Sequence, residues 1–468
     1  MQDEALTSDA LITELLAIFG EEACSVDEAR NRDYLTDESL HAAAAKPICV
    51  VWPRSTEQVL GLLAVATQAG VRVIARGSGT GLSGAAVATS NSIVCCFSRM
   101  NALLDLDIEN RACVVQPGIS LAELEEALSG TDLFYPVYPG ESSASLGGNI
   151  NTNAGGMRAV RHGVTRNHVL GLEVVLGSGL LLRSGGKYSK SSSGYDLTQL
   201  IIGSEGTLGL VTEITLKLSH RLALTSTALI PFASLEAVCA AVPAVDVGVI
   251  APSILEYLDF ITMDSLTKAA ELELAIDPKI KEQAMAYLVV VLEGLDESDL
   301  ERRNLALAQA MEELGGLELY LLAPKAGQAL IEARERAFYV AKAAGANDII
   351  DAVVPRMAIP SLLTKAGELA AEVGAFMTGC GHAGDGNVHL SVFCPDDQER
   401  QQLLTALFAQ VIELGGAVSG EHGLGTEKRS YHEALIDPAR VALDDQIKAI
   451  FDPHGVLRAL RPNTEESA

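Results

Sequence analysis

Two histidines near the end of the sequence are spaced so that they could bind one metal ion. His382 and His389 lie on either side of Asp385-Gly386, a dipeptide that favours the two-residue turn of a β-hairpin. In such a hairpin His382 faces His389, and directly opposed residues have Cβ atoms about 5 Å apart. This spacing suits two imidazoles on one ion, while the alternative is a pair of unrelated histidines on a solvated hairpin.

A glycine-rich segment, residues 415–425, contains the adjacent pair Glu421 and His422. Two histidines and a glutamate with an open fourth position form a catalytic zinc arrangement. We therefore expect a divalent metal held by His382, His389 and Glu421, with zinc as the first choice and manganese or iron as alternatives. A solvated polar turn is the competing interpretation of Glu421-His422 taken alone.

Residues 76–84 form another segment rich in glycine and small hydroxyl residues, and they follow an expected strand. The segment contains a GxGxxG pattern, which suggests a Rossmann dinucleotide site. That site requires an amphipathic helix directly after the glycines and an acidic residue about 20 positions later, and neither is present. Backbone N–H groups of such a segment can still converge on an anion, so we expect a phosphate nest. A mobile surface loop is the alternative.

Further clusters follow in a recognisable order. Residues 139–156 are dense in glycine, serine and asparagine, His162-Gly-Val-Thr165 comes next, and GSEGTLGLVTE occupies 203–213. Together with 76–84, these segments resemble the FAD-binding (PCMH-type) domain of the vanillyl-alcohol-oxidase-type flavoproteins over residues 47 to 220. The resemblance implies bound FAD. We expect noncovalent FAD, because 76–84 contain no histidine or cysteine.

The resemblance also implies which residues contact FAD, and most of them are glycines or small polar residues. They are Arg76, Gly77, Ser78, Gly79, Thr80, Gly81, Ser83, Pro139, Gly140, Ser145, Gly147, Gly148, Asn149, Asn153, Gly155, Gly156, Gly163, Val164, Glu205, Gly206, Gly209 and Val211.

The motifs at 382–389 and 419–428 resemble those of the D-2-hydroxy acid dehydrogenases, which include glycolate, D-lactate and D-2-hydroxyglutarate enzymes. With them the likeness covers nearly the whole chain. It implies that the metal ligands are those named above and that His422 is the catalytic base. Arg334 and Arg356 match substrate-binding arginines of this group, although Arg334 also suits an exposed helix charge.

The expected reaction is FAD-dependent oxidation of a small D-2-hydroxy acid to the 2-oxo acid, by metal-assisted proton abstraction and hydride transfer to flavin N5. Phe338 and Ile349 stand where 2-hydroxyglutarate enzymes place threonine and lysine, and Ser391 stands where some have asparagine. These departures favour D-lactate, glycolate or a related aliphatic acid over D-2-hydroxyglutarate. The sequence also leaves open an alkyl-glycerone-phosphate-synthase-like transferase and an inactive subunit. A quinone, a cytochrome or an electron-transfer flavoprotein could reoxidise the flavin.

The elements that must position these residues indicate an α+β fold. We expect a helical segment over 1–46, a PCMH-type FAD-binding domain over 47–221, and an α+β (ferredoxin-like) substrate cap domain with the metal site over 222–424. A C-terminal segment, 425–468, returns to the FAD domain. The hydrophobic pattern predicts helices at 9–20, 56–69, 297–314, 327–344 and 360–373.

Composition narrows the class of protein. Acidic residues outnumber basic ones 61 to 34 among 468 residues, and the net charge of −27 argues against nucleic acid as a partner. Eight scattered cysteines without a CxxC pair indicate reduced thiols. Neither a signal peptide nor an apolar run of membrane length is evident, so we expect a cytoplasmic protein, with peripheral association with the inner membrane left open. The apolar content is compatible with a homodimer.

Overall fold

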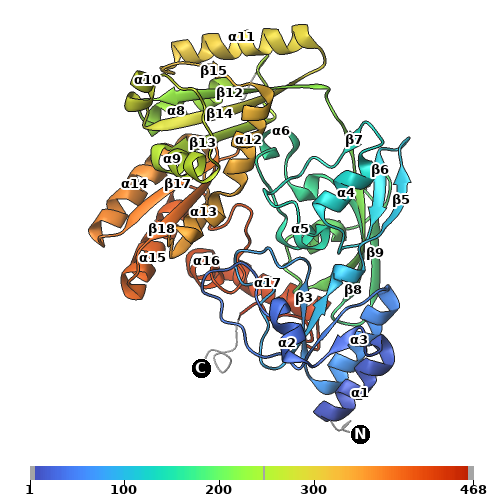
Figure 1. Ribbon diagram of the computed structural model, residues 1–468. Coiled ribbons are helices and arrows are strands. Elements are labelled where there is room, and N and C mark those ends of the chain that lie inside the picture. The colour runs from blue at the N-terminus through green and yellow to red at the C-terminus, as the bar shows by residue number, and fades with distance from the viewer. Residues whose placement is uncertain (1–5, 246–247, 462–468) are drawn as a thin grey trace.

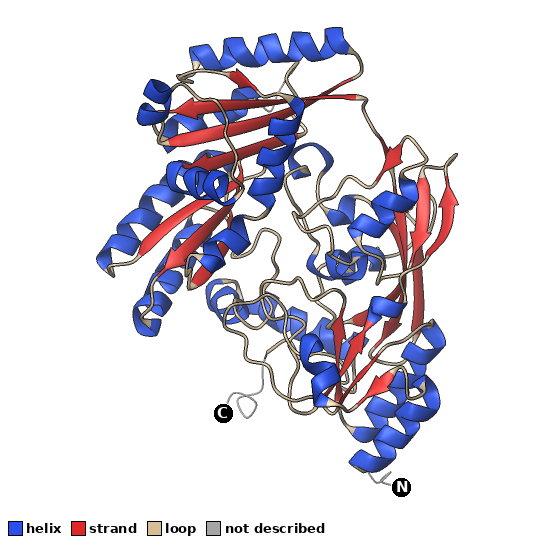
Figure 2. Cartoon of the chain, viewed as in Figure 1, coloured by secondary structure: helices blue, strands red, loops and turns tan. Residues whose placement is uncertain are grey.

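The computed structural model describes residues 6–245 and 248–461 (Figure 1). The outermost parts of the two expected terminal segments, 1–5 and 462–468, therefore lie outside the described residues. Helices and strands are mixed throughout, and the larger sheets lie in two bodies, one holding residues before about 220 and the other those after it (Figure 2). The expected α+β class is confirmed.

We call the body formed by residues before about 220 the FAD-binding body, because it contains the expected FAD-binding domain. Its first sheet has the strand order β1-β2-β4-β3, with β4 parallel to both neighbours. Its strands are β1 (Cys24–Ser25), β2 (Cys49–Val51), β3 (Arg72–Arg76) and β4 (Ser92–Cys96). Helices α1 (Ser8–Phe19) and α3 (Thr56–Ala69) pack on each other and share its core. Helix α3 begins where the Ser55 hydroxyl accepts a hydrogen bond from Gln58 N and ends at the left-handed Gly70.

The second sheet is antiparallel, with the order β5-β6-β10-β8-β9. Its strands are β5 (Leu103–Asp107), β6 (Ala112–Val115), β8 (Val169–Leu176), β9 (Leu181–Gly185) and β10 (Gly209–Lys217). Between them lie α4 (Leu121–Leu128), α5 (Leu146–Thr152), α6 (Ala159–His162), α7 (Leu197–Ile201) and the small pair β7 (Leu133–Phe134) and β11 (Ser219–His220). Long glycine-rich turns join these elements, as the sequence predicts.

The third sheet has seven strands in the order β15-β12-β14-β13-β17-β18-β16, all antiparallel to their neighbours. They are β12 (Leu224–Phe232), β13 (Ile254–Asp259), β14 (Ala286–Gly294), β15 (Tyr320–Leu321), β16 (Asp348–Val353), β17 (Phe376–His382) and β18 (Asn387–Phe393). Strand β14 is apolar without alternation, because both faces of this sheet are buried.

Helices cover both faces of this sheet. One face carries α8 (Leu235–Val245), α11 (Glu297–Glu313), α14 (Ile359–Glu372) and α15 (Asp397–Glu413). The other carries α9 (Phe260–Ala269), α10 (Pro278–Gln283), α12 (Pro324–Glu335) and α13 (Ala337–Ala343). The helix predicted over 327–344 is thus two helices, since the chain leaves helical geometry at Arg336.

The C-terminal segment returns to the FAD-binding body, as expected. After α16 (Arg429–Leu435) and α17 (Pro438–Phe451), Leu457 forms a parallel bridge with Val73 of β3. In Figure 1 these red helices lie beneath the junction of the two bodies. Among the described residues, the structure has no helix both long and apolar enough to cross a membrane.

Candidate functional site

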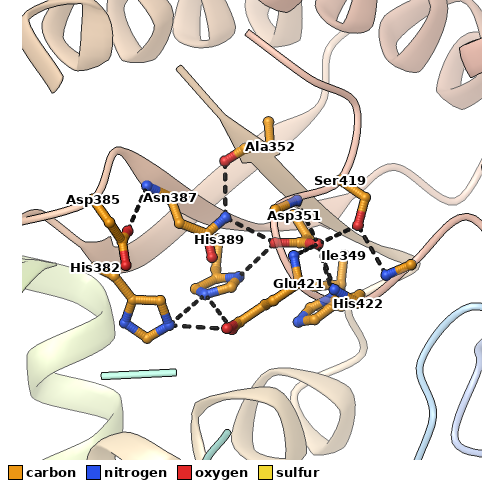
Figure 3. A network of polar contacts seen from close by, with 12 residues as sticks. Ile349, Asp351, Ala352, His382, Asp385, Asn387, His389, Ser419, Glu421 and His422 are labelled. Carbon is orange, nitrogen blue, oxygen red and sulfur yellow. Dashed lines mark hydrogen bonds and ion pairs between the residues drawn. The ribbon is translucent and has the colours of Figure 1, made fainter. Parts of the chain in front are cut away.

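The three predicted metal ligands meet at one point (Figure 3). His382 Nε2 lies 3.3 Å from His389 Nε2 and 3.1 Å from Glu421 Oε1, and His389 Nε2 lies 3.3 Å from the same oxygen. All three side chains are at least 87% buried, with exposed fractions of 6%, 13% and 9%. Two imidazole nitrogens and a carboxylate oxygen therefore form a nearly equilateral triangle inside the protein.

The two histidines meet although the predicted hairpin register is wrong. The turn holds four residues, 383–386, so that His382 pairs with Asn387 and His389 pairs with Cys380. Gly386 has a φ of 89°, and its Cβ would collide with the Val354 carbonyl, so the turn requires glycine there. Because the register differs from the expected one by two residues, both histidines stay on one face of the hairpin.

An unpredicted carboxylate, that of Glu256, contacts His382. Glu256 of β13 pairs in register with His382, is completely buried, and its Oε1 lies 2.5 Å from His382 Nδ1. Its Oε2 lies 2.8 Å from Nη2 of Arg334. Burial opposes the charged form of His382, but Glu256 and Glu421 raise its pKa well above the usual value. The sequence feature that could have identified Glu256 is an acidic residue flanked by apolar residues within the strand Ile254–Asp259.

A second unpredicted carboxylate, Asp351 of β16, organises the glycine-rich loop. Its Oδ2 accepts hydrogen bonds from the Ser419 hydroxyl (2.7 Å) and from the backbone N–H groups of Glu421 (3.0 Å) and His422 (2.8 Å). Burial opposes the charge of Asp351, but His422 and His389 hold its pKa at about 2. The loop that presents Glu421 and His422 is thus folded around a buried anion.

His422 lies beside the triangle. Its ring stacks on that of His389 with centroids 5.2 Å apart, and its Nδ1 lies 4.0 Å from Asp351 Oδ2. Burial lowers the pKa of His422 to about 4, so the imidazole is neutral at physiological pH. A neutral imidazole can accept a proton, which is what a general base requires.

The triangle fits a tetrahedral metal site. Zinc binds nitrogen and oxygen ligands at about 2.0 to 2.2 Å, which places tetrahedral ligand atoms roughly 3.3 Å apart. The distances of 3.1 to 3.3 Å match this spacing, and Glu421 Oε2 is buried without a hydrogen-bond partner. Asp351, His389 and His422 form a second group of metal-binding type. Oxygen Oδ2 of Asp351 is occupied by loop donors, so we interpret Asp351 as an orienting residue.

Most of the predicted FAD residues line two cavities, one within the FAD-binding body and one at the junction of the two bodies. One cavity is lined by Arg76, Gly77, Ser78, Gly79, Thr80, Gly81, Ser145, Gly147, Gly148, Glu205, Gly206 and Val211. The other is lined by Thr80, Gly81, Pro139, Gly140, Ser145, Gly148, Asn149 and also by Glu421 and His422. The second cavity therefore joins the glycine segments to the histidine cluster.

The remaining predicted FAD residues lie outside these two linings. They are Ser83, Asn153, Gly155, Gly156, Gly163, Val164 and Gly209. The guanidinium of Arg76 donates hydrogen bonds to the carbonyls of Asp33 and Thr36 and lies against Gly79 of the glycine segment. Ser83 instead connects the bodies: its hydroxyl donates to the carbonyls of His422 and Gly423.

The two candidate substrate arginines differ in position. Arg334 is buried and lines the cavity that contains the histidine cluster, whose volume is about 270 Å³. Arg356 lies in the short 3-10 turn Arg356–Ala358 that precedes α14, is exposed and does not contribute to this lining. Phe338, Ile349 and Ser391, the departures noted in the sequence, all line the same cavity.

Two protein-family models match the chain. Residues 47–185 match the FAD binding domain family, and residues 222–459 match the C-terminal domain of FAD linked oxidases. An FAD-linked oxidoreductase of Mycobacterium tuberculosis is 48% identical over 92% of this chain and 94% of its own. The glycolate oxidase subunit GlcD of Bacillus subtilis is 35% identical over 88% of each chain.

A D-lactate dehydrogenase of Archaeoglobus fulgidus is 34% identical over 88% of this chain and 91% of its own. Among solved structures, p-cresol methylhydroxylase superposes with a TM-score of 0.77 over 96% of this chain and 95% of its own, at 15% identity. That likeness confirms the fold expected from the glycine segments.

Proposed function

Since the chain belongs to the FAD-linked oxidases, in the group of glycolate oxidase subunits and D-lactate dehydrogenases, we propose that it oxidises a small D-2-hydroxy acid to the 2-oxo acid. The observation that carries the proposal is the triangle of His382, His389 and Glu421 beside His422. These four residues share one cavity with residues of the FAD-binding body.

Each residue has a role that follows from its position. His382, His389 and Glu421 would hold the divalent cation, and Pro139 and Gly140 lie where the FAD-binding body meets the same cavity. When bound, the cation polarises the substrate hydroxyl and FAD supplies the electron acceptor. Arg334 offers a buried guanidinium to the substrate carboxylate.

His422 accepts the hydroxyl proton at Nε2, the ring nitrogen opposite the one that faces Asp351. Asp351 stabilises the resulting imidazolium across 4.0 Å. The loop that carries His422 is hydrogen-bonded to both bodies, through Asp351 on one side and Ser83 on the other. His422 therefore lies where the cavity of the histidine cluster meets the cavity lined by the glycine segments.

The test is anaerobic bleaching of the bound flavin by a panel of D- and L-2-hydroxy acids. We expect D acids to bleach it, and His422→Asn to keep FAD but slow bleaching by at least about a hundredfold, the usual contribution of a general base. His454→Asn, at an exposed position in the C-terminal segment, is the control. Bleaching of the His422→Asn protein at the normal rate would remove His422 from this role.

The same experiment separates the competing functions. D-2-hydroxyglutarate as the best reductant would favour a 2-hydroxyglutarate dehydrogenase. An alkyl-glycerone-phosphate-synthase-like transferase would turn over without net reduction of the flavin by any hydroxy acid. Release of the flavin into the supernatant after acid precipitation would establish the noncovalent binding that we propose for FAD.

A further inference from the structure

The face of the hairpin that carries the histidines changes from polar to apolar along its length. On this face of β17 and β18, Cys380 is opposite His389, Thr378 is opposite Ser391, and Phe376 is opposite Phe393. All six residues line the cavity, and the rings of Phe376 and Phe393 are 5.7 Å apart. The end of this face nearest the histidine cluster, which we call the metal end, is therefore polar. The middle carries the hydroxyls of Thr378 and Ser391, and the opposite end is aromatic.

The opposite walls of the cavity are helical and mostly apolar. Helix α13 turns Ala337, Val340 and Ala341 toward it, at the i, i+3 and i+4 spacing of one helix face. Helix α9 contributes Ile261 and Leu266. This apolar part of the cavity, which we call the tail pocket, continues directly from the histidine cluster.

The tail pocket offers no cation to a second carboxylate. Among the described residues that line the cavity, Arg334 is the single lysine or arginine, and it lies at the metal end, where it is paired with Glu256. Glu335 lines the same cavity, and burial raises its pKa to about 7. A distal carboxylate would lie among apolar side chains, where an unpaired charge is strongly disfavoured.

Two apolar side chains at the rim of the tail pocket are unusually exposed. Ile261 is 43% and Phe376 is 46% exposed, and both line the cavity. Exposed apolar groups that border a cavity are typical of a binding site for an apolar ligand. A ligand that follows the hairpin from His389 toward Phe376 would remove both from water.

We propose that the tail pocket binds an unbranched apolar substituent of about four to six carbons, so that the preferred substrate is a D-2-hydroxy acid with an aliphatic tail of that length. This rests on the function proposed above. Strands rise about 3.3 Å per residue, so the Phe376–Phe393 pair lies roughly 13 Å along the hairpin from the Cys380–His389 pair. Since carbon–carbon bonds are about 1.5 Å long, an extended eight-carbon acid, whose tail has six carbons, covers about 9 Å. A van der Waals contact distance of about 4 Å then brings the end of the tail to the two phenyl rings.

The first experiment measures kcat/KM of the FAD-loaded enzyme with a dye acceptor for D-2-hydroxypropanoate, -butanoate, -hexanoate and -octanoate. Each buried methylene is expected to raise kcat/KM about fourfold until the pocket is filled. D-2-hydroxyglutarate should be a poorer substrate than D-2-hydroxypentanoate, which has the same number of carbons. A flat or falling series would overturn the tail pocket, whereas no oxidation of any member would overturn the proposed function instead.

The second experiment narrows the pocket. Ala341→Phe places a ring in the wall of α13, and Ala343→Phe places the same ring at an exposed position of that helix outside the lining. We expect Ala341→Phe to lower the ratio of kcat/KM for octanoate over propanoate at least about tenfold, because at least two methylenes lose their contacts. Ala343→Phe should leave this ratio unchanged. Equal ratios for both variants and the parent would refute the assignment.

Discussion

Replacing Glu256 with glutamine removes a charge while nearly keeping the shape of the side chain. The carboxylate touches His382 Nδ1 at 2.5 Å and Arg334 Nη2 at 2.8 Å, and it has no exposure to solvent. A carboxylate in this position fixes the tautomer of a metal-binding histidine and raises its basicity. Glutamine can accept a hydrogen bond from Nδ1 but supplies no charge.

The expected loss has two parts. Loss of the carboxylate partner of a metal-binding histidine costs about 10- to 100-fold in metal affinity. Removing one member of a buried ion pair destabilises a protein by about 3 to 5 kcal/mol, because the other charge, here on Arg334, stays buried and unpaired. The side chain of Arg334 is only 10% exposed, so solvent screens this charge little.

The two parts require two measurements. Metal affinity is obtained by competition with a chelator at fixed pH, and the free energy of unfolding is obtained from urea titration of the metal-free protein. Glu293→Gln is the matched control, since Glu293 of β14 pairs with Arg161 at 3.6 Å outside the cluster. It should change neither the metal affinity nor, by more than about 1 kcal/mol, the stability.

One result would refute the reasoning about His382. If Glu256→Gln bound metal as tightly as the parent while Glu293→Gln behaved as expected, Glu256 would not orient the ligand. Unchanged stability would show that the pair with Arg334 contributes nothing. A parent protein that binds no divalent metal under any condition would remove the metal from the proposed function.

Three further outcomes are expected. Gly425→Ala should lower the free energy of unfolding in urea titrations by at least about 2 kcal/mol more than Gly455→Ala. Both glycines have a positive φ, but only at Gly425 would the added Cβ meet backbone, at 1.7 Å from the Ser83 carbonyl oxygen. Equal losses for the two variants would contradict this. Asp351→Asn should cost about 2 to 3 kcal/mol in the same titration and slow flavin bleaching, since the loop loses a charged acceptor; a variant with normal stability would show that the anion is dispensable. Burial lowers the pKa of His162 to about 4, so between pH 6.5 and 4 the unfolded chain binds a proton that the folded chain does not. The free energy of unfolding should therefore fall by up to about 3 kcal/mol as the pH is lowered over this range. In thermal melts at each pH, His162→Gln should show a shallower loss of stability than the parent protein.

The sequence was sufficient to predict which three side chains meet in the triangle. His382, His389 and Glu421 were selected by residue type and by their glycine-rich surroundings, and the structure brings their atoms to within 3.3 Å. The histidines converge despite a wrong register, since a shift of two residues preserves the face of a strand. The FAD-binding fold and the return of the C-terminal segment could also be predicted, because the order and spacing of the glycine segments are specific to one family of FAD-binding domains.

The orienting carboxylates could not be assigned in the same way. Glu256 and Asp351 lie on strands whose places beside the hairpin depend on the sheet order β13-β17-β18-β16. That order pairs Glu256 with His382, 126 positions later, and Asp351 with His389, 38 positions later, and nothing local in the sequence specifies either pairing. Helix α12 likewise presents Arg334 to Glu256 only through packing on the third sheet. A charged residue in an apolar strand can be recognised as a candidate orienting residue, but the sequence does not show which side chain it contacts.

The loop at 419–425 couples the two bodies of the protein. Glu205 of the FAD-binding body accepts hydrogen bonds from Leu424 N and Gly425 N and pairs with Arg458 at 3.2 Å. The loop that carries His422 is therefore fixed both by Glu205, which precedes residue 220, and by Asp351 of the third sheet. A substitution that removes the Glu205 carboxylate would therefore disturb the position of His422 as well, although the two residues are 217 positions apart in the sequence.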